Sequence, residues 1–399
     1  LYEILAHTEG VVVFHEQVIQ IIATMTGVSL ATADEKRRSL GDRAGQQEVC
    51  DWFFPAATAK GYELPIIQEI WDVLRAFASF GFCKAHAAAF ALPTYQSAWL
   101  KTHYPAAFLA AVLTHDPGMY PKRLIVDEAR QMGITIASID VNASDSVYRV
   151  EDHGNAIRIA LSTVAGISDT EVQSIIAGRP YIDLNDFVRR SGCSTPVTES
   201  LILTGGFDSL HADVNRRDLL LHFSDLQKSP SAAVSGAQMN LGFDPPALIS
   251  SGLPAMSAAE SVKYEVDRLG IDMSRHMIEF YGDFLNAIGA VRSSDLLKQR
   301  SQSSVLVAGI KVAMQTPPVR SGKRVIFLTL DDGYGLSDST FFTDVQGEYA
   351  NVLYSTSLLL VRGVTRRTGA RGISIRATGA WDLRAAYESW SAKQSTLAI

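Results

Sequence analysis

The sequence predicts a multidomain α+β protein in which helices fill the first part and short strands fill the last quarter. Three observations predict this class. At 399 residues the chain is longer than a single hydrophobic core usually supports. Apolar residues recur at helical spacing up to about residue 135, and five short β-type runs follow residue 300. We expect domains over residues 1–150, 151–228, 229–300 and 301–385, and a C-terminal tail over 386–399.

The composition is that of a globular protein, with 47% hydrophobic and 20% charged residues. No apolar run reaches membrane-spanning length, so we expect a cytoplasmic protein without a membrane partner. Cys50, Cys83 and Cys193 have no CxxC spacing, which favours neither a disulfide framework nor a zinc site. The chain starts with LYEILAHTEG, without methionine, and we therefore expect it to be a piece of a longer protein.

The charge is unevenly distributed. The net charge of −6 lacks the overall positive excess that is typical of nucleic-acid-binding proteins. From residue 301 onward, however, basic residues outnumber acidic ones. The basic residues there are Lys311, Arg320, Lys323, Arg324, Arg362, Arg366, Arg367, Arg371, Arg376, Arg384 and Lys393.

Three helices are predicted in the N-terminal part. Val18, Ile21, Ile22 and Met25 form an apolar stripe that ends at Gly27. A second helix is predicted over 65–80. A third is predicted over 94–103, where Pro105 stops it, and its residues Tyr95, Trp99 and Leu100 are expected to face inward.

The middle of the chain combines one hairpin with short helices. The runs SVYRVE and AIRIAL flank Asp152-His153-Gly154, a turn sequence that predicts a β-hairpin. Ser168 and Glu171 have the spacing of a capping box, and Gly178 ends the helix that follows. Another helix begins at Thr195-Pro196 and runs into Gly205-Gly206. The segment KSPSAAVSGAQ (228–238) has the composition of a linker.

A second helical patch covers about 257–299, and strands follow it. The five strands are SVLVAGIKVAM, RVIFLTLDD, STFFTD, SLLLVRGVT and GISIRAT. Five strands in about 80 residues predict a small β-barrel of the OB type. Asp331-Asp332 is interpreted as a solvated turn between two of these strands rather than as a metal-binding pair.

Motifs of several catalytic classes are missing. The chain has no DxD pair for two-metal nucleotide chemistry, no GxxxxGK[ST] loop, no HExxH and no GxSxG. The sequence therefore predicts no catalytic residue and no metal ligand within this chain.

Two basic clusters lie in the helical N-terminal part. One is Lys36-Arg37-Arg38, and the other is Lys84 with His86 in the stretch SFGFCKAHAAAF. A solvated helix face and a partly buried histidine are the ordinary interpretations. The neighbouring aromatic and glycine residues favour contact with a phosphate or a base edge instead.

A glycine turn precedes the capped helix, at Ala165-Gly166-Ile167-Ser168. In a helix-hairpin-helix element such a turn brings backbone N–H groups to a DNA phosphate without reading sequence. Gly205-Gly206 is a second candidate hairpin some 40 residues later, which favours a tandem element. Ordinary helix ends remain the alternative at both places.

A short peptide follows the linker. Gln238, Leu241 and Phe243 form a QxxLxF pattern, the type of peptide that docks on bacterial sliding clamps. A plain transition from linker to helix is the alternative.

Three long strings resemble one family. They are GVVVFHEQVIQIIATMTGVSLATADEKRRSLGD, FGFCKAHAAAFALPTYQSAWLKTHYPAAFLAAVL and EVDRLGIDMSRHMIEFY. In this order they resemble the bacterial DNA polymerase III α subunit, and more narrowly its error-prone, damage-induced paralogue of the ImuC type. The resemblance implies the C-terminal part of the fingers, tandem helix-hairpin-helix, a linker and an OB domain.

The resemblance also implies roles for particular residues. Arg37, Arg38, Lys84 and His86 match fingers residues near the incoming nucleotide, although Cys83 stands where the family has asparagine. The hairpins at Gly166, Ile167 and Ser168 and at Gly205 and Gly206 resemble those that hold duplex DNA, and the barrel resembles a single-strand-binding module. The family's palm aspartates, which hold Mg²⁺, are absent, so no cofactor is expected in this chain and it is not expected to transfer nucleotides alone.

The implied partners are primer-template DNA, an incoming dNTP in the complete protein, a Y-family-like partner of the ImuB type and an accessory protein. A sliding clamp remains open as a further partner. The chain ends soon after the barrel, which favours the error-prone type over the replicative α subunit. The alternatives are a piece of the replicative subunit and a protein-interaction scaffold with little DNA binding.

Overall fold

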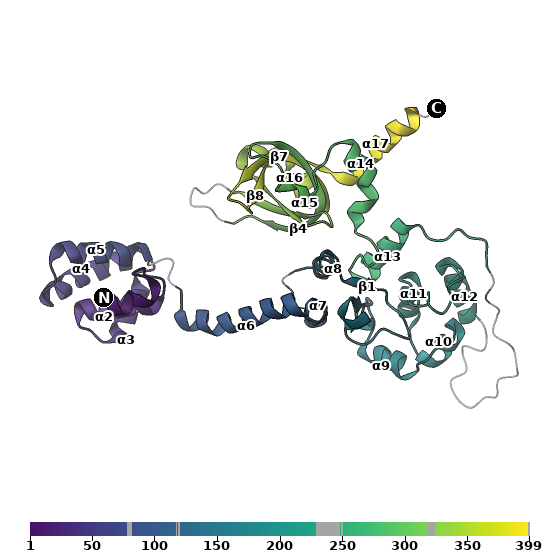
Figure 1. The fold of residues 1–399 in the computed structure, drawn as a ribbon, viewed down its shortest axis with the longest axis horizontal. Coiled ribbons are helices and arrows are strands. Elements are labelled where there is room, and N and C mark those ends of the chain that lie inside the picture. Colours follow the sequence, from purple (N-terminus) through teal and green to yellow (C-terminus); the bar gives the residue numbers. More distant parts are fainter. Residues whose placement is uncertain are drawn as a thin grey trace. The chain divides into compact units, whose positions relative to one another are not determined.

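The computed structural model describes residues 1–77, 82–116, 118, 120–228, 248, 250–317 and 324–397. The chain forms two compact units, residues 1–102 and 103–399 (Figure 1). No helix among these described residues combines the length and apolar character needed to cross a membrane.

The first unit consists of helices. They are α1 (Tyr2–Leu5), η1 (Ala6–Thr8), α2 (His15–Thr26), α3 (Leu30–Ser39), α4 (Arg43–Ala59), α5 (Leu64–Phe77) and α6 (Lys84–His103), the last of which ends at the boundary. The predicted stripe on α2 is confirmed, because Val18, Ile21, Ile22 and Met25 are all buried. They pack with residues of α4 such as Phe53, and Gly27 ends α2 at φ 75°.

Helix α6 differs from the prediction. It begins at Lys84 rather than Thr94 and runs through Pro93. The alanine run after Lys84 has high helix propensity, and this outweighs the hydrogen bond lost at the proline. Tyr95, Trp99 and Leu100 are exposed, so the prediction that they face inward is wrong.

The second unit begins with two helices and a small sheet. Helices α7 (Pro105–His115) and α8 (Lys122–Gln131) precede strands β1 (Thr135–Ala137), β2 (Arg149–Glu151) and β3 (Ala156–Arg158). Strand β3 lies in the middle, parallel to β1 and antiparallel to β2. The predicted hairpin is confirmed: Asp152, His153 and Gly154 connect β2 and β3 with positive φ angles.

Short helices follow the sheet. They are η3 (Leu161–Thr163), α9 (Asp169–Ala177), α10 (Leu184–Ser191), α11 (Thr195–Leu203), α12 (Arg216–Lys228) and, beyond the undescribed residues, α13 (Ala258–Leu269), η5 (Met277–Tyr281), α14 (Gly282–Ala287) and α15 (Ser293–Leu296), while η2 (Asp152–Gly154) is the turn between β2 and β3. Tyr181, Phe187 and Phe207 are buried among them, with the Phe187 ring 4.9 Å from each of the other two. Ser168 and Glu171 form the predicted capping box of α9.

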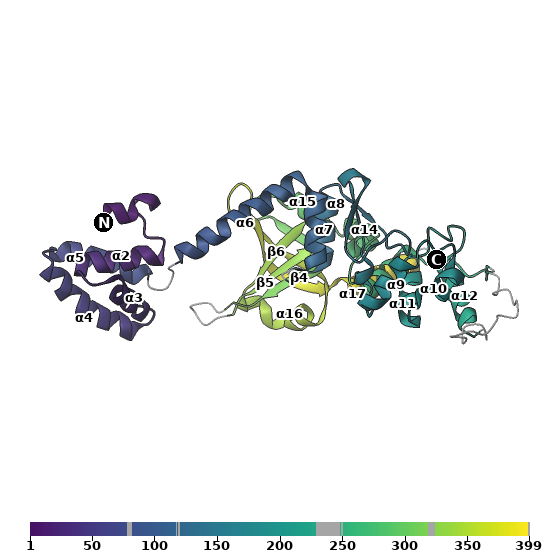
Figure 2. The ribbon, with the colours of Figure 1, turned by 90° about the horizontal axis from the view of Figure 1, so that it is seen from below.

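The predicted five-stranded barrel is confirmed. Its strands are β4 (Ser304–Gln315), β5 (Ile326–Asp331), β6 (Leu336–Phe341), β7 (Leu358–Arg367) and β8 (Ile373–Asp382), closed in the order β4-β5-β6-β8-β7. Helix α16 (Thr343–Ser355) covers one end and inserts the fully buried Leu353 (Figure 2). The β6–β8 pairing is parallel and closes the barrel, which leaves no long free edge. The residues expected as a tail lie largely in helix α17 (Leu383–Leu397).

Candidate nucleic-acid interface

The first glycine turn is open to solvent. Gly166 has a φ of 81°, and an added Cβ there would find no atom within 4 Å. Ala165, Gly166 and Ser168 are exposed, while Val164 on the other side of the turn is buried in the core. A backbone of this shape leaves room for a ligand such as a phosphate to approach closely.

The start of helix α9 is already occupied by a carboxylate. Glu171 Oε2 accepts hydrogen bonds from the N–H and hydroxyl of Ser168, at 2.9 and 2.8 Å. Its Oε1 accepts from the N–H and hydroxyl of Ser194, at 2.9 and 2.7 Å. The backbone N–H groups of Ser194 and Ser168 lower the pKa of Glu171 to about 2. A phosphate at this helix start would meet this negative charge.

The second glycine turn is buried. The N–H groups of Gly205 and Gly206 donate to the carbonyls of Ile202 and Leu201, at 3.2 and 2.7 Å, and so end helix α11. Gly205 has a φ of 90°, and a Cβ on it would lie 2.3 Å from the Arg216 guanidinium. The two N–H groups face the protein, so this turn resembles a helix end more than an open phosphate site.

The segment around both turns is acidic. Residues 133–219 contain twelve acidic residues, seven arginines and no lysine. Each arginine already has an acceptor within the protein. The pairs are Arg149 with Asp145, Arg158 with Glu151, Arg179 with the Val141 and Ser144 carbonyls, Arg189 and Arg190 with Asp186, Arg216 with Asp208, and Arg217 with Glu260.

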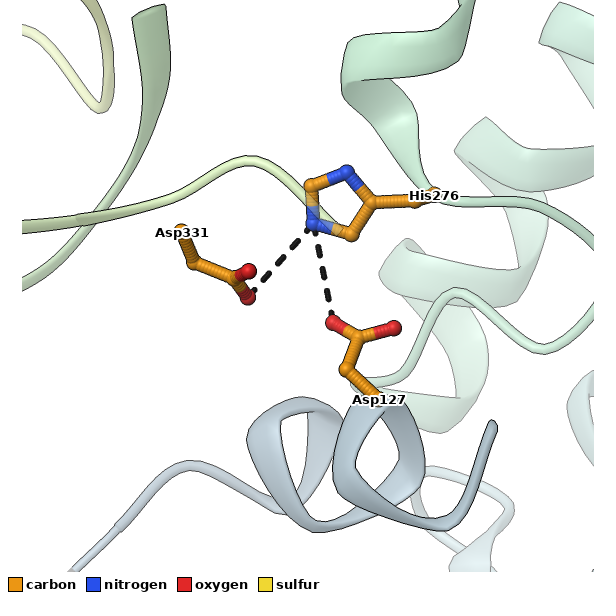
Figure 3. Close-up of side chains that lie close together, drawn as sticks. All are labelled: Asp127, His276 and Asp331. Carbon is orange, nitrogen blue, oxygen red and sulfur yellow. Dashed lines mark ion pairs between the residues drawn. The ribbon is translucent and has the colours of Figure 1, made fainter. Parts of the chain in front are cut away.

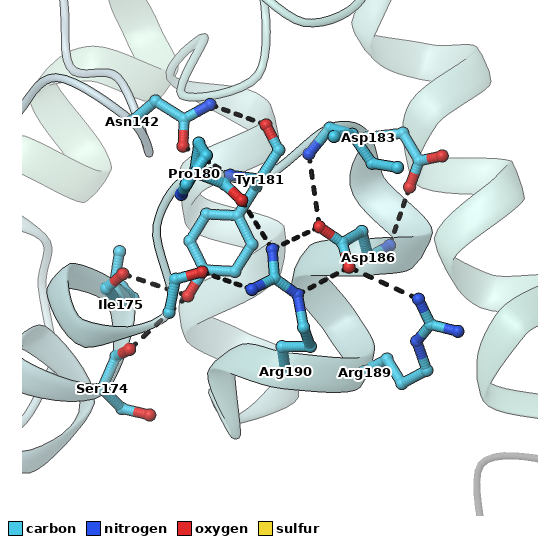
Figure 4. A network of polar contacts seen from close by, with 11 residues as sticks. Asn142, Ser174, Ile175, Pro180, Tyr181, Asp183, Asp186, Arg189 and Arg190 are labelled. Carbon is cyan, nitrogen blue, oxygen red and sulfur yellow. Dashed lines mark hydrogen bonds and ion pairs between the residues drawn. The ribbon is translucent and has the colours of Figure 1, made fainter.

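Arg190 is the most connected of these arginines (Figure 4). Its Nε donates to Asp186 at 2.6 Å, and its other nitrogens donate to the carbonyls of Gly178 and Pro180 at 2.5 and 2.7 Å. The guanidinium also stacks 4.8 Å from the Tyr181 ring centre. Arg190 therefore fixes the loop before α10 and has little capacity left for a phosphate.

The barrel presents a different surface. Gln315, Phe327, Thr340 and Arg376 lie directly opposite one another across strands β4, β5, β6 and β8. Phe327 is 45% exposed, and Arg376 is also exposed. The Arg376 guanidinium lies 5.4 Å from the ring of exposed Phe342 and 3.2 Å from Asp344.

Arg366 and Arg371 of the barrel are also exposed, and Arg366 lies opposite Ser374, two residues before Arg376 on β8. Arg366 lies near the end of β7, and Arg371 lies in the loop between β7 and β8. We call Phe327, Phe342, Arg366, Arg371 and Arg376 the barrel face. Aromatic rings on which bases stack, alternating with cations that meet phosphates, are typical of single-strand binding.

The predicted nucleotide-contact residues lie in the first unit. Arg37 and Arg38 both pair with Asp34, at 2.9 and 2.7 Å, and Arg38 is the more exposed. At the start of α6 the Lys84 Nζ lies 5.9 Å from the Phe14 ring, and the Lys84 N–H donates to the Glu16 carboxylate at 3.0 Å. Motif reasoning missed Glu16, which holds the start of α6 against α2.

His86 lies in the same place, between two aromatic rings. Its ring is 5.8 Å from Phe82 and 4.6 Å from Phe90, and it is exposed. The predicted clamp peptide, Gln238, Leu241 and Phe243, lies outside the described residues, as does most of the predicted linker.

The prediction that Asp331-Asp332 forms a solvated turn is wrong. Asp331 is 1% exposed and Asp332 is 8% exposed. Asp332 accepts from the N–H and hydroxyl of Ser293, at 2.7 and 2.5 Å, so a distant segment covers the turn. Gly333 and Gly335 make the turn itself, with positive φ angles.

Asp331 belongs to a buried cluster with Asp127 and His276 (Figure 3). His276 Nε2 lies 3.6 Å from Asp127 Oδ2 and 3.5 Å from Asp331 Oδ2. Within the described residues this is the one group that could hold a metal ion. However, His276 Nδ1 accepts the Ile278 N–H at 3.3 Å, which places the proton of the neutral ring on Nε2. A protonated Nε2 has no lone pair for a cation, so we assign no metal here.

Two family descriptions match parts of the chain. Residues 1–61 match the bacterial DNA polymerase III alpha subunit finger domain. This matched range contains Arg37 and Arg38, whereas Lys84 and His86 lie beyond it. Residues 133–219 match the helix-hairpin-helix motif, which includes both glycine turns.

Relatives match nearly the whole chain. The error-prone DNA polymerase of Symbiobacterium thermophilum is 32% identical over 94% of this chain, which spans 39% of that protein. The DNA polymerase III subunit alpha of Vibrio cholerae is 30% identical over 98% of this chain, which spans 35% of that protein. The error-prone DNA polymerase of Bdellovibrio bacteriovorus is 28% identical over 93% of the chain, which spans 37% of that protein. The chain belongs to the bacterial DNA polymerase III α-subunit family and corresponds to less than two fifths of the length of these relatives.

Proposed function

We propose that this chain is the DNA-handling part of an error-prone DNA polymerase and that its barrel binds the single-stranded template. The barrel face carries the proposal, because it combines exposed rings with exposed arginines on adjacent strands. Stacking on an aromatic ring tolerates any base, and arginine holds the backbone, so binding would not depend on sequence.

Binding of labelled oligothymidylate, measured by fluorescence anisotropy at several salt concentrations, tests this proposal. We expect Phe327→Ala to lower the affinity by about 5- to 150-fold, since stacking contributes about 1–3 kcal/mol per base. Tyr354→Ala on α16 is the matched control, because Tyr354 is a similarly exposed aromatic residue outside the barrel face. Equal affinities of the two variants would contradict the proposal.

We propose that duplex DNA and the incoming nucleotide are contacted elsewhere in the chain. The open Gly166 turn, with Ile167 and Ser168, is the candidate for duplex DNA, and Arg37, Arg38, Lys84 and His86 are the candidates for the triphosphate. Nucleotide transfer itself would need Mg²⁺ held by carboxylates outside this chain. In the full-length polymerase, Arg37→Ala with Arg38→Ala should raise the KM for dNTP more than tenfold, since cations near a triphosphate act through its charge. An unchanged KM and kcat would remove these two residues from the site.

A protein-interaction role is the second candidate. The acidic character of residues 133–219 favours it, because every arginine there is engaged within the protein. The ImuB-type partner and accessory protein expected for an error-prone enzyme, and a sliding clamp, are the partners to test. Partner binding that persists without any measurable DNA binding, at both low and moderate salt, would support this role instead.

A further inference from the structure

The buried cluster of Asp127, His276 and Asp331 joins three separate segments of the second unit. Asp127 lies on α8, His276 lies between α13 and η5, and Asp331 ends barrel strand β5. Their exposures are 3%, 3% and 1%. The side chains point toward one another from these three segments (Figure 3). The cluster is therefore a contact between the barrel and the helices that precede it.

Three polar atoms that meet in the cluster have no hydrogen-bond partner: Asp127 Oδ2, His276 Nε2 and Asp331 Oδ2. A buried polar atom without a partner costs free energy, so something must compensate. The other carboxylate oxygens are satisfied: Asp127 Oδ1 accepts from Arg130 at 2.6 Å, and Asp331 Oδ1 accepts from the Gly333 N–H at 3.0 Å.

Negative charge exceeds positive charge around these atoms. On α8, Arg130 pairs with Asp127, and Arg123 is engaged by the Lys311 carbonyl. The segment before η5 contributes Asp272, which is 1% exposed and whose two carboxylate oxygens are also unpartnered. On η5, Glu279 faces the backbone N–H of His276 at 3.4 Å, and in the β5–β6 turn Asp332 is saturated by Ser293 and Tyr334.

His276 does not neutralise this excess. Its Nδ1 accepts the Ile278 N–H, so a ring proton lies on Nε2 and faces both carboxylates. At 3.5 and 3.6 Å that proton makes no short hydrogen bond to either of them. Burial lowers the pKa of His276, but Asp331 and the charges of Asp127 and Asp272 raise it overall. Even a cationic ring would leave three buried carboxylates, Asp127, Asp272 and Asp331, beside two cations, His276 and Arg130. The carboxylate oxygens of Asp127 and Asp331 both face His276 Nε2 and lie within 4.8 Å of each other.

We propose that Asp127 is protonated in the folded protein and that this proton, shared with Asp331, fastens helix α8 to the barrel. Asp127 would then donate and Asp331 would accept. Protonation at this point removes one buried charge and supplies a partner for two of the unsatisfied oxygens. The junction is in this sense a proton-dependent clamp.

The titration of the two carboxyl groups is consistent with this arrangement. Burial, with the charges of Asp272 and Asp331, raises the pKa of Asp127 to about 7, while His276 and Arg130 oppose the rise. At Asp331 burial also acts to raise the pKa, but the nearby His276 and the hydrogen bond from the Gly333 N–H lower it overall. A pair whose pKa values are pushed apart holds one proton between them.

Gly333 makes this contact possible. A Cβ on Gly333 would lie 2.8 Å from the His276 ring, so only glycine allows the imidazole to approach the β5–β6 turn. The φ of Gly333, 79°, also favours glycine.

Urea unfolding of the whole chain between about pH 5 and pH 8.5 tests the clamp. A group whose folded pKa is raised contributes stability at low pH that is lost as the pH rises through the folded pKa. Relative to Asp127→Asn, wild type should therefore lose stability on going from pH 5 to pH 7. The ratio of their unfolding constants should change by up to about tenfold per pH unit and level off above about pH 7.5. The amide of the variant donates where the proton would, without titrating.

The controls distinguish a shared proton from a bound cation and from a general loss of stability. Asp338→Asn, on exposed Asp338 of the neighbouring strand, should keep the wild-type pH dependence. Asp331→Asn should destabilise the protein throughout the range, because its single amide oxygen cannot accept both the Gly333 N–H and the proton of Asp127, and its NH2 group faces one of these donors. The same pH dependence in wild type and Asp127→Asn would overturn the proposal. So would stabilisation of wild type by Zn²⁺ that Asp127→Asn abolishes, because a cation would then fill the cluster.

A local measurement keeps the proposal testable if the variants fold poorly. In wild type, hydrogen exchange of residues 122–131 and 331–336, corrected for the intrinsic pH effect, should accelerate between pH 6 and pH 8 relative to helix α9. Uniform behaviour of all three segments would also overturn the proposal.

Discussion

The helix-hairpin-helix segment and the barrel are both regions in which DNA contact is expected, but their arginines behave differently. In residues 133–219 every arginine is paired with a carboxylate or a backbone carbonyl. On the barrel, Arg366 and Arg371 are exposed, and Arg376, although it pairs with Asp344, is exposed beside the Phe342 ring. The comparison shows that a match to a motif describes the backbone, whereas phosphate binding depends on whether charges are free to act.

The same contrast holds for the two glycine turns. Gly166 and Gly205 both have positive φ angles, but one faces open space and the other lies against Arg216 and Asp208. Sequence spacing treats the two turns as equivalent. Their surroundings separate them into one turn that a ligand can reach and one that packing has filled.

Reversing the charge of two exposed barrel arginines should have the largest effect on binding of single-stranded DNA. Arg366→Glu with Arg371→Glu should lower affinity for single-stranded DNA by roughly a hundredfold and reduce the slope of log affinity against log salt by about 1.4, since each phosphate contact on a single strand contributes about 0.7. Anisotropy titrations at several salt concentrations measure both quantities.

Arg149→Glu with Arg189→Glu is the matched pair in the helical segment. Both side chains are exposed, and both already pair with aspartates. We expect less than about a threefold change in affinity for single-stranded DNA, because these charges are already neutralised. If this pair weakens binding as much as the barrel pair does, arginines that pair within the protein are still available to DNA and the contrast fails.

Substitutions of Gly205 and Gly166 should also differ in how much they destabilise the protein. Gly205→Ala combines a strained φ with the approach to Arg216 and should destabilise the protein by about 2–3 kcal/mol. Gly166→Ala has only the strained φ and should cost about 1 kcal/mol. Thermal and urea unfolding measure these costs.

The affinity of the same two variants for double-stranded DNA shows which glycine turn contacts a phosphate. Gly166→Ala should weaken binding to double-stranded DNA, because the added methyl group lies where a phosphate would approach. Folded Gly205→Ala should bind as wild type does. The reverse pattern would assign the phosphate contact to the second turn.

The sequence predicted the parts of the fold that depend on local patterns. The α2 stripe ending at Gly27, the capping box of Ser168 and Glu171, and the five barrel strands each follow from residues close together in the chain. It did not predict features that need distant partners. Asp331 looks like a turn residue until Asp127 and His276 cover it, and the arginines of the helical segment look available until their acceptors are known.

The start of α6 was missed for a related reason. The predicted helix over 94–103 leaves out the alanine run before Pro93, which continues the helix back to Lys84, where the carboxylate of Glu16, 68 positions earlier, caps its first turn. A local rule for proline cannot include a cap that comes from another helix.

Substitution of Glu171 is expected to give one of the smallest changes in the free energy of unfolding. Its pKa of about 2 means that its contribution is present above its ordinary pKa and is lost as the pH falls through about 2. Glu171→Gln removes the charge and one of the two acceptor oxygens, so one serine N–H loses its acceptor and the substitution should cost about 1 kcal/mol at neutral pH. The difference between wild type and variant in urea unfolding should shrink toward pH 2.

The same substitution tests whether the charge of Glu171 weakens DNA binding at the first glycine turn. Removing a negative charge from the start of α9 leaves the backbone N–H groups with a neutral partner that a phosphate can displace more easily. Affinity for duplex DNA should therefore rise two- to fivefold in Glu171→Gln, while affinity for single-stranded DNA, which we propose to depend on the barrel face, should stay the same. A rise in both would show that the charge acts over the whole surface, and the two regions could then no longer be treated as separate binding sites.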